Sequence, residues 1–195
     1  MRPIKFLTEK IFNKLFYRPI LKRKLGQVGT NFKLGYYSEV LNPEYFSFGD
    51  NFYCGPFAYF GTNKNNPVKI GDYVMFGPRC IIQGGNHRID FEGFMYLNKN
   101  IDHMSDTIII ENGVWIGSNT TIISGAKIGE GSIIGAMSLV NKSIPPYVIA
   151  GGVPVKVIKP RFKTKEQIEA TLLETKSAYT IEKILQIHSN IGITY

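Results

Sequence analysis

The sequence predicts a mainly β protein, a parallel β-helix of six-residue repeats with N-terminal and C-terminal helices and one long protruding loop. Three observations support this prediction. Residues 110–145 form six consecutive hexads, a weaker form of the same repeat runs through residues 28–83, and residues 84–106 between them have no period. A six-residue period fits neither an α-helix nor a simple alternating strand, but it fits a coil of short strands and tight turns.

Residues 1–27 are predicted to form an amphipathic helix ahead of the coil, with its pattern over residues 4–25. Apolar residues recur there near helical spacing among basic ones: Ile4, Leu7, Ile11, Leu15 and Phe16. Pro19 is expected to break or kink this helix. Two roles remain open. The helix can cover the end of the coil, where exposed strand edges invite aggregation, or it can lie on an anionic membrane.

The repeat opens each hexad on a large residue and usually places a small or β-branched residue fifth. In the regular part the opening residues are Ile110, Ile116, Ile122, Ile128, Ile134 and Val140. Earlier hexads open at Val28, Leu34 and Val40, then after a slip of two residues at Phe48, Cys54 and Phe60, and then at Ile70, Phe76 and Ile82. Because aromatic residues enter these earlier hexads, we expect the first rungs to be wider or less regular. The polar run of residues 63–66 is expected to bulge from a corner.

Residues 28–162 are assigned to the β-helix domain and residues 163–195 to a C-terminal helical tail. The aperiodic stretch 84–106 is long enough to be a functional loop. Three prolines near the end of the domain indicate a rigid departure from the repeat. A helical pattern then covers residues 164–189, with Thr164 as its N-cap. We expect this tail to pack on the coil or on a neighbouring subunit.

Composition narrows the class of protein. The 195 residues are 44% hydrophobic and 19% charged, which favours one globular domain with appendages. No apolar run approaches the roughly 20 residues of a membrane span, and the first ten residues do not resemble a secretory signal. The net charge of +8 fits a solvated basic surface, an anionic ligand or a membrane, but no nucleic-acid-binding motif accompanies it. Cys54 and Cys80 are expected to be core residues in a reducing cytosol, so we expect a cytoplasmic protein.

His87 is the candidate catalytic residue, because it stands where the repeat hands over to the aperiodic loop. A neutral imidazole can accept a proton from a hydroxyl or amine, although a surface histidine remains the alternative. Asp90, Asp102 or Asp106 could orient its ring. The other histidines, His103 and His188, lack such a context, and three scattered histidines do not predict a metal site. Trp115, the one tryptophan, is either cover for a turn or an apolar platform for a ligand chain.

Several motifs together resemble the hexapeptide-repeat acyltransferases with a left-handed β-helix. These motifs are the hexads, GGNHRID, VWIGSN, IGAMSLVNKSIPP and AGGVPVKVIKPRF. The resemblance covers about residues 28–162 and lies with the xenobiotic, galactoside and maltose acetyltransferases and with sugar O-acetyltransferases of surface-polysaccharide pathways. It implies a homotrimer that binds acetyl-CoA between adjacent coils and needs no metal.

The resemblance also assigns residues one by one. His87 matches the catalytic histidine of the family, and Trp115 matches the tryptophan beside the pantetheine arm. Ser118 and Ala136 match positions whose backbone lines the pantetheine channel. Lys142 and Lys159 match basic positions near the nucleotide phosphates, and Gly151 and Lys156 are weaker matches in the closing element.

The expected function is transfer of an acetyl group from acetyl-CoA to a sugar hydroxyl, in surface polysaccharide or lipopolysaccharide biosynthesis. The acceptor would be a sugar, a sugar nucleotide or a lipid-linked sugar. Aromatic residues of the early rungs are candidates to build its site: Tyr36, Tyr37, Phe57 and Tyr59. An antibiotic acetyltransferase is the alternative, although the loop after His87 lacks the Thr-x-Pro-Phe ending of xenobiotic enzymes and Val155 replaces the usual alanine. A non-catalytic scaffold and a zinc lyase are remoter alternatives.

Overall fold

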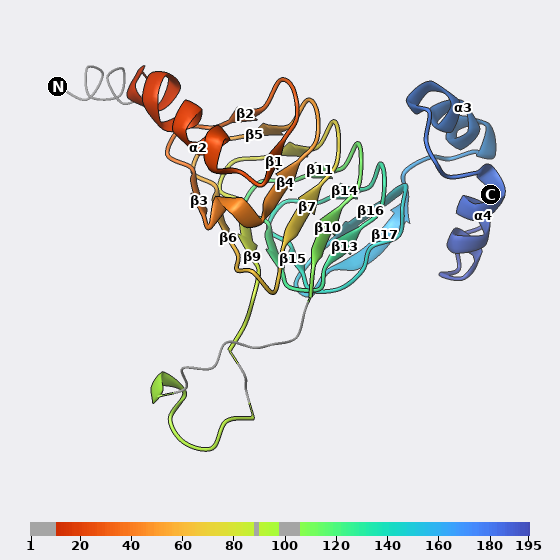
Figure 1. Ribbon diagram of the computed structural model, residues 1–195. Coiled ribbons are helices and arrows are strands. Elements are labelled where there is room, and N and C mark those ends of the chain that lie inside the picture. Colours follow the sequence, from red (N-terminus) through yellow and green to blue (C-terminus); the bar gives the residue numbers. More distant parts are fainter. Residues whose placement is uncertain (1–10, 88–89, 98–105) are drawn as a thin grey trace.

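The computed structural model describes residues 11–87, 90–97 and 106–195 as a three-sided coil with helices at its two ends (Figure 1). Sheet A contains β1 (Gln27–Val28), β4 (Phe46–Phe48), β7 (Val68–Ile70), β10 (Ile108–Ile110) and β13 (Lys127–Ile128). Sheet B contains β2 (Lys33–Leu34), β5 (Tyr53–Cys54), β8 (Met75–Phe76), β11 (Trp115–Ile116), β14 (Ile133–Ile134), β16 (Val148–Gly151) and β17 (Lys156–Pro160). Sheet C contains β3 (Glu39–Leu41), β6 (Tyr59–Gly61), β9 (Ile81–Gln83), β12 (Thr121–Ile123) and β15 (Leu139–Val140).

The strand pairing is parallel throughout the coil, and its register confirms the predicted β-helix. In sheet A the successive partners are Val28, Phe48, Ile70, Ile110 and Ile128, so the separations are 20, 22, 40 and 18 residues. Sheets B and C show the same four separations. All extra residues therefore lie between a strand of sheet C and the next strand of sheet A. The slip of two residues and the bulge at residues 63–66 both fall at this corner.

The interior of the coil is formed by the first and fifth residues of the hexads. The opening isoleucines of residues 110–134 and Val140 are at most 1% exposed. The fifth-position residues Val114, Thr120 and Ala126 are fully buried. In the earlier rungs this space is filled by aromatic rings: Phe32, Phe46, Phe48, Phe52, Phe60 and Phe76. The 20- and 22-residue turns confirm that these rungs are less regular.

Cys54 and Cys80 are both part of this core, as predicted. Burial raises the pKa of each thiol above its ordinary value, because the apolar surroundings disfavour the thiolate. Neither sulfur is therefore suited to act as a nucleophile.

The N-terminal helix ends at Lys24 and covers the first rung. It includes a π-helical turn, η1 (Asn13–Tyr17), followed by α2 (Arg18–Lys24). Of the two predicted outcomes, a break or a kink, the break does not occur, because Pro19 lies in the first turn of α2. The widened turn ahead of it accommodates a residue that has no N–H to donate. Leu21 and Leu25 are buried in the core of the coil.

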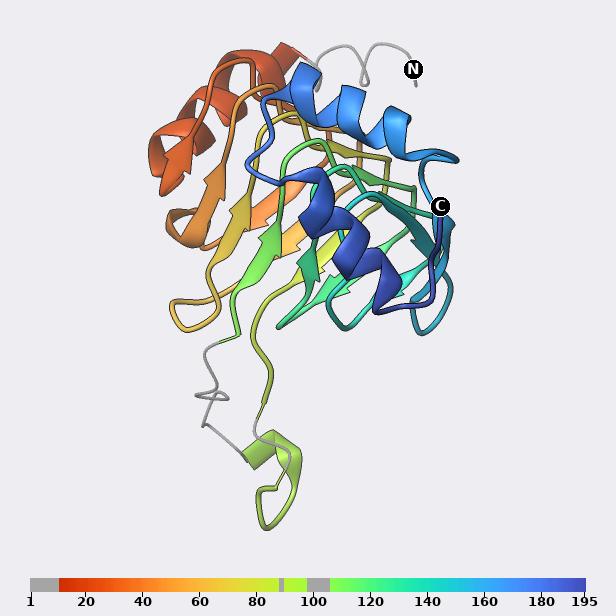
Figure 2. The same ribbon diagram turned by 90° about the vertical axis from the view of Figure 1, so that its right-hand side faces the viewer.

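The C-terminal tail packs on the other end of the coil (Figure 2). β17 pairs with β16 in antiparallel fashion and leads to α3 (Lys165–Thr175) and α4 (Ile181–Ser189). Thr164 is the N-cap of α3, as predicted, and forms a capping box with Gln167. The tail contains two helices and not one, because Lys176 adopts a left-handed conformation that ends α3. Two short 3₁₀ helices, η2 (Pro43–Tyr45) and η3 (Met95–Leu97), complete the described elements.

His188 holds the end of the tail in place. Its side chain is fully buried. Its Nε2 lies 2.8 Å from the Pro146 carbonyl, and its Nδ1 lies 2.7 Å from the Tyr195 hydroxyl. Both ring nitrogens are therefore used in packing the tail, so His188 has a structural role.

Candidate active site

Three insertions into the repeat meet at the corner between sheets C and A. They are residues 42–45, 63–66 and 84–107, and each lies one rung further along the coil than the one before. They border a hollow of about 400 Å³. It is lined by Leu41, Asn42, Tyr59, Gly61, Thr62, Asn63, Gln83, Gly84, Gly85, Asn86 and His87. Because amide and hydroxyl side chains dominate the lining, the hollow suits a hydroxylated ligand better than an apolar one.

His87 stands at the edge of this hollow, four residues after the end of β9. Its side chain is exposed, and its backbone N–H donates to Asn86 Oδ1 at 2.9 Å. An imidazole in this position can reach a hydroxyl bound in the hollow. Asp102 and His103 lie outside the described residues. Which carboxylate orients His87, and whether the imidazole acts as a base, therefore stay predictions.

The chain leading to His87 is fixed by contacts between rungs. The Gly85 N–H donates to Ser124 Oγ at 2.6 Å, which ties the start of the loop to the next rung. A Cβ on Gly84 would collide with the Thr62 hydroxyl, so only glycine fits at this position. Gly85 has a φ of +84°, which also favours glycine. The loop thus starts from a rigid base two residues before His87.

Three of the residues assigned to coenzyme A form a continuous surface on sheet B and at the corner that follows it. Trp115 points outward from β11, between its partners in β8 and β14, and its side chain is 49% exposed. Ser118 and Ala136 occupy the same corner in successive rungs. A Cβ on Gly117 would lie 2.5 Å from the Ala136 nitrogen, so glycine allows the two turns to stack. The three predicted residues are therefore brought together.

The two predicted phosphate-binding lysines lie on different sides of the coil. Lys159 belongs to β17 and pairs with Ile149, so it extends the surface of sheet B. Lys142 follows β15 and lies at the corner between sheets C and A. Gly151 and Lys156, the weaker matches, pair with each other in the β16–β17 hairpin. The side chains of all three lysines are exposed.

A single coil does not bring His87 to the surface formed by Trp115, Ser118 and Ala136. Trp115, Ser118 and Ala136 lie on sheet B and on its corner with sheet C. His87 lies on the far edge of sheet C, with one strand of that sheet, β9, between it and the corner at Arg79. A site that uses both groups therefore needs a second copy of the chain.

Several residues of the hollow were not predicted from the sequence. Asn42, Thr62, Asn63 and Gln83 line it, and Ser124 holds the base of the loop. The slips in the repeat were the available signal, because every slip falls at the same corner. Of the aromatic residues expected to build the acceptor site, Tyr59 lines the hollow. At the corner between sheets B and C, Tyr37 and Phe57 stack on each other, and Tyr36 contacts both rings edge-on.

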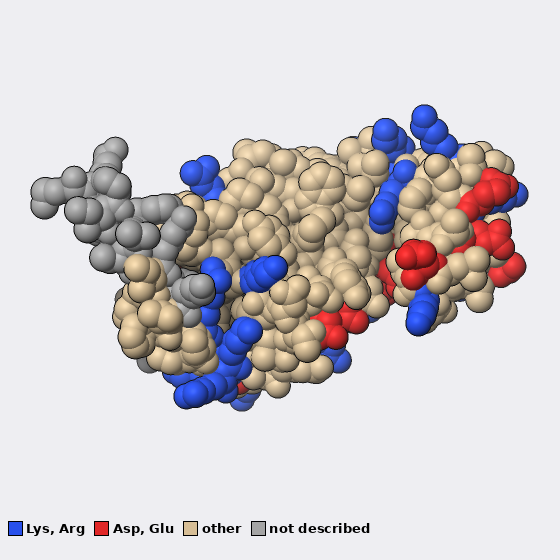
Figure 3. Space-filling view, turned by 90° about the horizontal axis from the view of Figure 1, so that it is seen from above, with Lys and Arg blue, Asp and Glu red and all other residues tan. Residues whose placement is uncertain are grey.

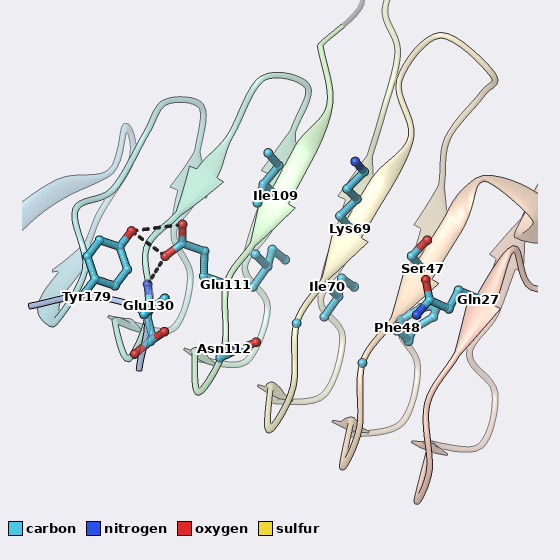
Figure 4. A pocket seen from close by; sticks show the side chains of 14 residues that line it. Gln27, Ser47, Phe48, Lys69, Ile70, Ile109, Glu111, Asn112, Glu130 and Tyr179 are labelled. Atoms are coloured by element: carbon cyan, nitrogen blue, oxygen red, sulfur yellow. Dashed lines mark hydrogen bonds between the residues drawn. The ribbon is translucent and has the colours of Figure 1, made fainter. Parts of the chain in front are cut away.

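A larger hollow of about 700 Å³ lies on sheet A, beside the tail (Figure 4). Tyr179 donates from its hydroxyl to the Glu111 carboxylate, at 3.0 and 3.2 Å, and the Glu130 N–H donates to the same carboxylate at 2.8 Å. Burial and the nearby Glu111 charge raise the pKa of Tyr179 to about 12. These groups fasten the tail to the coil, and the hollow contains none of the predicted site residues. Within the described ranges no three His, Cys, Asp or Glu side chains gather as a metal site would require.

Known proteins share this repeat and this coil. The family model "Bacterial transferase hexapeptide (six repeats)" matches residues 107–142. The chain is 38% identical over 144 residues to a galactoside O-acetyltransferase of Escherichia coli (strain K12), covering 72% of this chain and 66% of that relative. It is 34% identical over 171 residues to a chloramphenicol acetyltransferase of Klebsiella aerogenes, covering 79% of each.

A solved structure supports the same assignment. A galactoside acetyltransferase in complex with coenzyme A superposes with a TM-score of 0.66 and 31% identity, over 76% of this chain and 72% of that one. The chain spans just under two thirds of the length of the galactoside O-acetyltransferase from Escherichia coli. The repeat, the three-sided coil and these relatives together show that the chain belongs to the hexapeptide-repeat acetyltransferases, whose fold is a left-handed parallel β-helix.

Proposed function

We propose that this protein transfers an acetyl group from acetyl-CoA to a sugar hydroxyl and that His87 is its general base. The observation that carries the proposal is the position of an exposed histidine at the mouth of a polar hollow. Amide and hydroxyl side chains of this kind can hydrogen-bond a polyol. The galactoside O-acetyltransferase among its relatives supports a sugar acceptor, and the coenzyme A complex supports the donor.

We propose that the working unit is a homotrimer. Sheet B exposes large apolar side chains such as Tyr53, Met75 and Trp115, and sheet C exposes Ile81. The outward side chains of sheet A are more polar, as at Lys69. Burying sheets B and C against neighbouring copies would remove this apolar surface from water. It would also place His87 of one copy against the Trp115 surface of the next.

The loop supports the same assembly. Residues 90–97 stand away from the coil (Figure 1), and their tip exposes Phe94, Met95, Tyr96 and Leu97. Tyr96 is 97% exposed and Phe94 is 81% exposed. An apolar tip held far from its own core is expected to pack on a neighbouring coil.

The proposed chemistry is direct transfer between two bound substrates. His87 takes the proton of the sugar hydroxyl while its oxygen attacks the thioester carbonyl. The turn at Gly117 and Ser118 has two backbone N–H groups that could stabilise the oxyanion. The Gly117 N–H already donates to the Ile134 carbonyl at 2.8 Å, so the Ser118 N–H is assigned this role. The tetrahedral intermediate then expels the thiolate of coenzyme A, and this thiolate takes from His87 the proton that came from the sugar hydroxyl. The exposed Lys142 and Lys159 are assigned to the phosphates.

The His87→Ala variant tests the general base. We expect loss of acetyl transfer by about 10²–10⁴-fold, measured as release of the coenzyme A thiol. Binding of coenzyme A by calorimetry and the mass by sedimentation should not change. Lys64→Ala is a matched control, since Lys64 is exposed in the same corner but does not line the hollow. Undiminished turnover by His87→Ala would overturn the proposal.

An antibiotic acetyltransferase is the second candidate, favoured by the match to a chloramphenicol acetyltransferase over 79% of each chain. A panel of galactosides, nucleotide sugars, chloramphenicol and a streptogramin separates the two functions. We expect the highest kcat/KM with a sugar. A preference for either drug would replace the sugar proposal.

A further inference from the structure

The N-terminal helix carries an apolar stripe that its own chain leaves uncovered. Its members are Ile11, Phe12, Leu15, Phe16 and Ile20, which we call the N-terminal stripe, and each is between 47% and 61% exposed. The rings of Phe12 and Phe16 stack on each other, with centroids 5.5 Å apart. Five large apolar side chains on one helix form a contiguous patch of the kind that marks an interaction site.

The stripe is not the face that covers the coil. Leu21 and Leu25 are buried in the core, and Tyr17 packs against it. These three residues already attach the helix to the first rung. The helix stands at the end of the coil that is opposite to α3 and α4 (Figure 1), so the stripe lies clear of the C-terminal tail. The role of a cap therefore explains one face of the helix and leaves the stripe unexplained.

The charged residues of the helix itself, within residues 11–24, are all basic. Lys22, Arg23 and Lys24 form the last turn of α2, and the first turn contains no acidic residue. Figure 3 shows basic side chains at this end of the molecule, whereas the C-terminal end carries both acidic and basic side chains. An apolar stripe bordered by basic residues is the pattern of a helix that lies in the plane of an anionic membrane. No helix in the described part of the chain is long and apolar enough to cross a membrane.

We propose that this helix docks the protein on an anionic lipid bilayer. The N-terminal stripe enters the boundary between headgroups and acyl chains, and Lys22, Arg23 and Lys24 lie among the acidic headgroups. A second copy of the chain fits the stripe less well. Residues 11–24 contain basic residues and no acidic one, so two helices packed stripe to stripe would bring like charges together in either orientation, and that repulsion opposes association. Anionic lipid satisfies both the apolar and the charged parts of the surface.

Membrane docking would place the enzyme where lipid-linked sugars lie, a consequence that rests on the acetyl transfer proposed above. In a homotrimer of parallel coils, three such helices would share one end of the assembly. Each helix alone would bind weakly, whereas three on one surface bind with a much higher effective affinity. The docking itself depends on neither the acceptor nor His87.

Vesicle co-sedimentation of the full chain tests the proposal. We expect binding to phosphatidylcholine vesicles that contain phosphatidylglycerol and at least tenfold weaker binding to phosphatidylcholine alone, because each nearby Lys or Arg adds about fivefold. The double variant Phe12→Asp/Phe16→Asp should lose at least tenfold of the binding to the anionic vesicles. Leu173→Asp is the matched control, since Leu173 is 76% exposed on α3 at the other end, and it should bind as the parent does.

Two further measurements identify the occupant of the stripe. The double variant should keep its sedimentation mass and its acetyl transfer to a soluble acceptor. A loss of mass would mean that the stripe packs on a neighbouring subunit, and the proposal would be wrong. Equal binding of the parent and the double variant to anionic vesicles would also overturn it. A protein without transferase activity that still binds these vesicles would refute the proposed function and leave the docking intact.

Discussion

The coil of residues 28–83 and the coil of residues 108–145 share three ladders of parallel strands but differ in how each turn is made. The first half fills its interior with phenylalanine and adds residues to every turn, so that its rungs are 20, 22 and 40 residues apart. The second half is filled by isoleucine, valine and smaller residues, and its rungs are 18 residues apart. The hollow beside His87 belongs to the first half, whereas the smooth surface of Trp115, Ser118 and Ala136 belongs to the second.

This difference shows how a repeat protein gains a site without losing its core. Extra residues at the corner between sheets C and A leave all three ladders in register, since every sheet shows the same separations. The corner between sheets B and C contains no additions, and its turns stack closely at Gly117. The corner between sheets C and A is therefore free to vary, and the corner between sheets B and C is fixed by packing.

Insertion variants test this contrast most directly and should give the largest effect. Two glycines placed between Ile116 and Gly117 would separate turns that are now joined by the Gly117 N–H and the Ile134 carbonyl at 2.8 Å. We expect the free energy of unfolding to fall by more than about 3 kcal/mol. The same two glycines between Ser124 and Gly125 extend the tolerant corner and should cost about 1 kcal/mol. Urea unfolding of both variants measures the difference, and equal losses would contradict the contrast.

Core truncations compare the two interiors in one column of sheet C. Phe60→Ala removes a ring whose centroid lies 5.3 Å from that of Phe76, and we expect the free energy of unfolding to fall by about 3–5 kcal/mol. Ile122→Ala leaves a smaller cavity. Its free energy of unfolding should therefore fall by an amount near the lower end of a range of about 2–5 kcal/mol. Denaturant unfolding monitored by circular dichroism measures the loss of stability in each variant. A larger loss for Ile122→Ala would mean that the aromatic half is the more loosely packed.

The loop base gives a prediction on activity. Ser124→Ala removes the hydroxyl that accepts from the Gly85 N–H at 2.6 Å, so the residues before His87 should lose their fixed position. We expect kcat to fall about tenfold, a loss near 1.4 kcal/mol, while binding of coenzyme A and the pH profile stay as they are. Ser124→Thr keeps the hydroxyl and should recover most of the rate. A rate that is unchanged in Ser124→Ala would show that His87 does not depend on this contact.

The smallest expected effect concerns the tail. The pKa of Tyr179 is raised from 10.0 to about 12, so burial stabilises its neutral form. Its contribution to stability is then complete below pH 10 and is lost as the pH rises toward 12. Tyr179→Phe should lower the Tm slightly at neutral pH, through the lost bond to Glu111, and flatten the decline of Tm between pH 10 and 12. Tyr147, whose pKa is also raised by burial and by Glu130, should retain part of that decline.

The sequence sufficed for the coil because a period of six residues is a local signal. The isoleucines that open the hexads are the residues found in the interior, and Thr164 caps α3 as expected. The same signal did not tell which corner receives each slip, so the asparagines of the hollow and Ser124 were missed. It also could not show that His87 lies beyond the far edge of sheet C while Trp115 lies on sheet B. The sequence also did not show that Pro19 is accommodated without a break, because its position in the first turn of α2 follows a π-helical turn.

The insertions at the corner between sheets C and A lie in layers, one layer for each rung of the coil. Neighbouring parallel strands lie about 4.8 Å apart, and Asn42, Asn63 and Gly84 begin the insertions of three successive rungs. A side chain also connects two successive layers, since Asn42 Nδ2 donates to the Thr62 carbonyl at 2.6 Å. The backbone positions from which these insertions start are therefore about one strand spacing apart. Substitutions within one insertion can therefore change one layer of the hollow and leave the backbone at His87 in place.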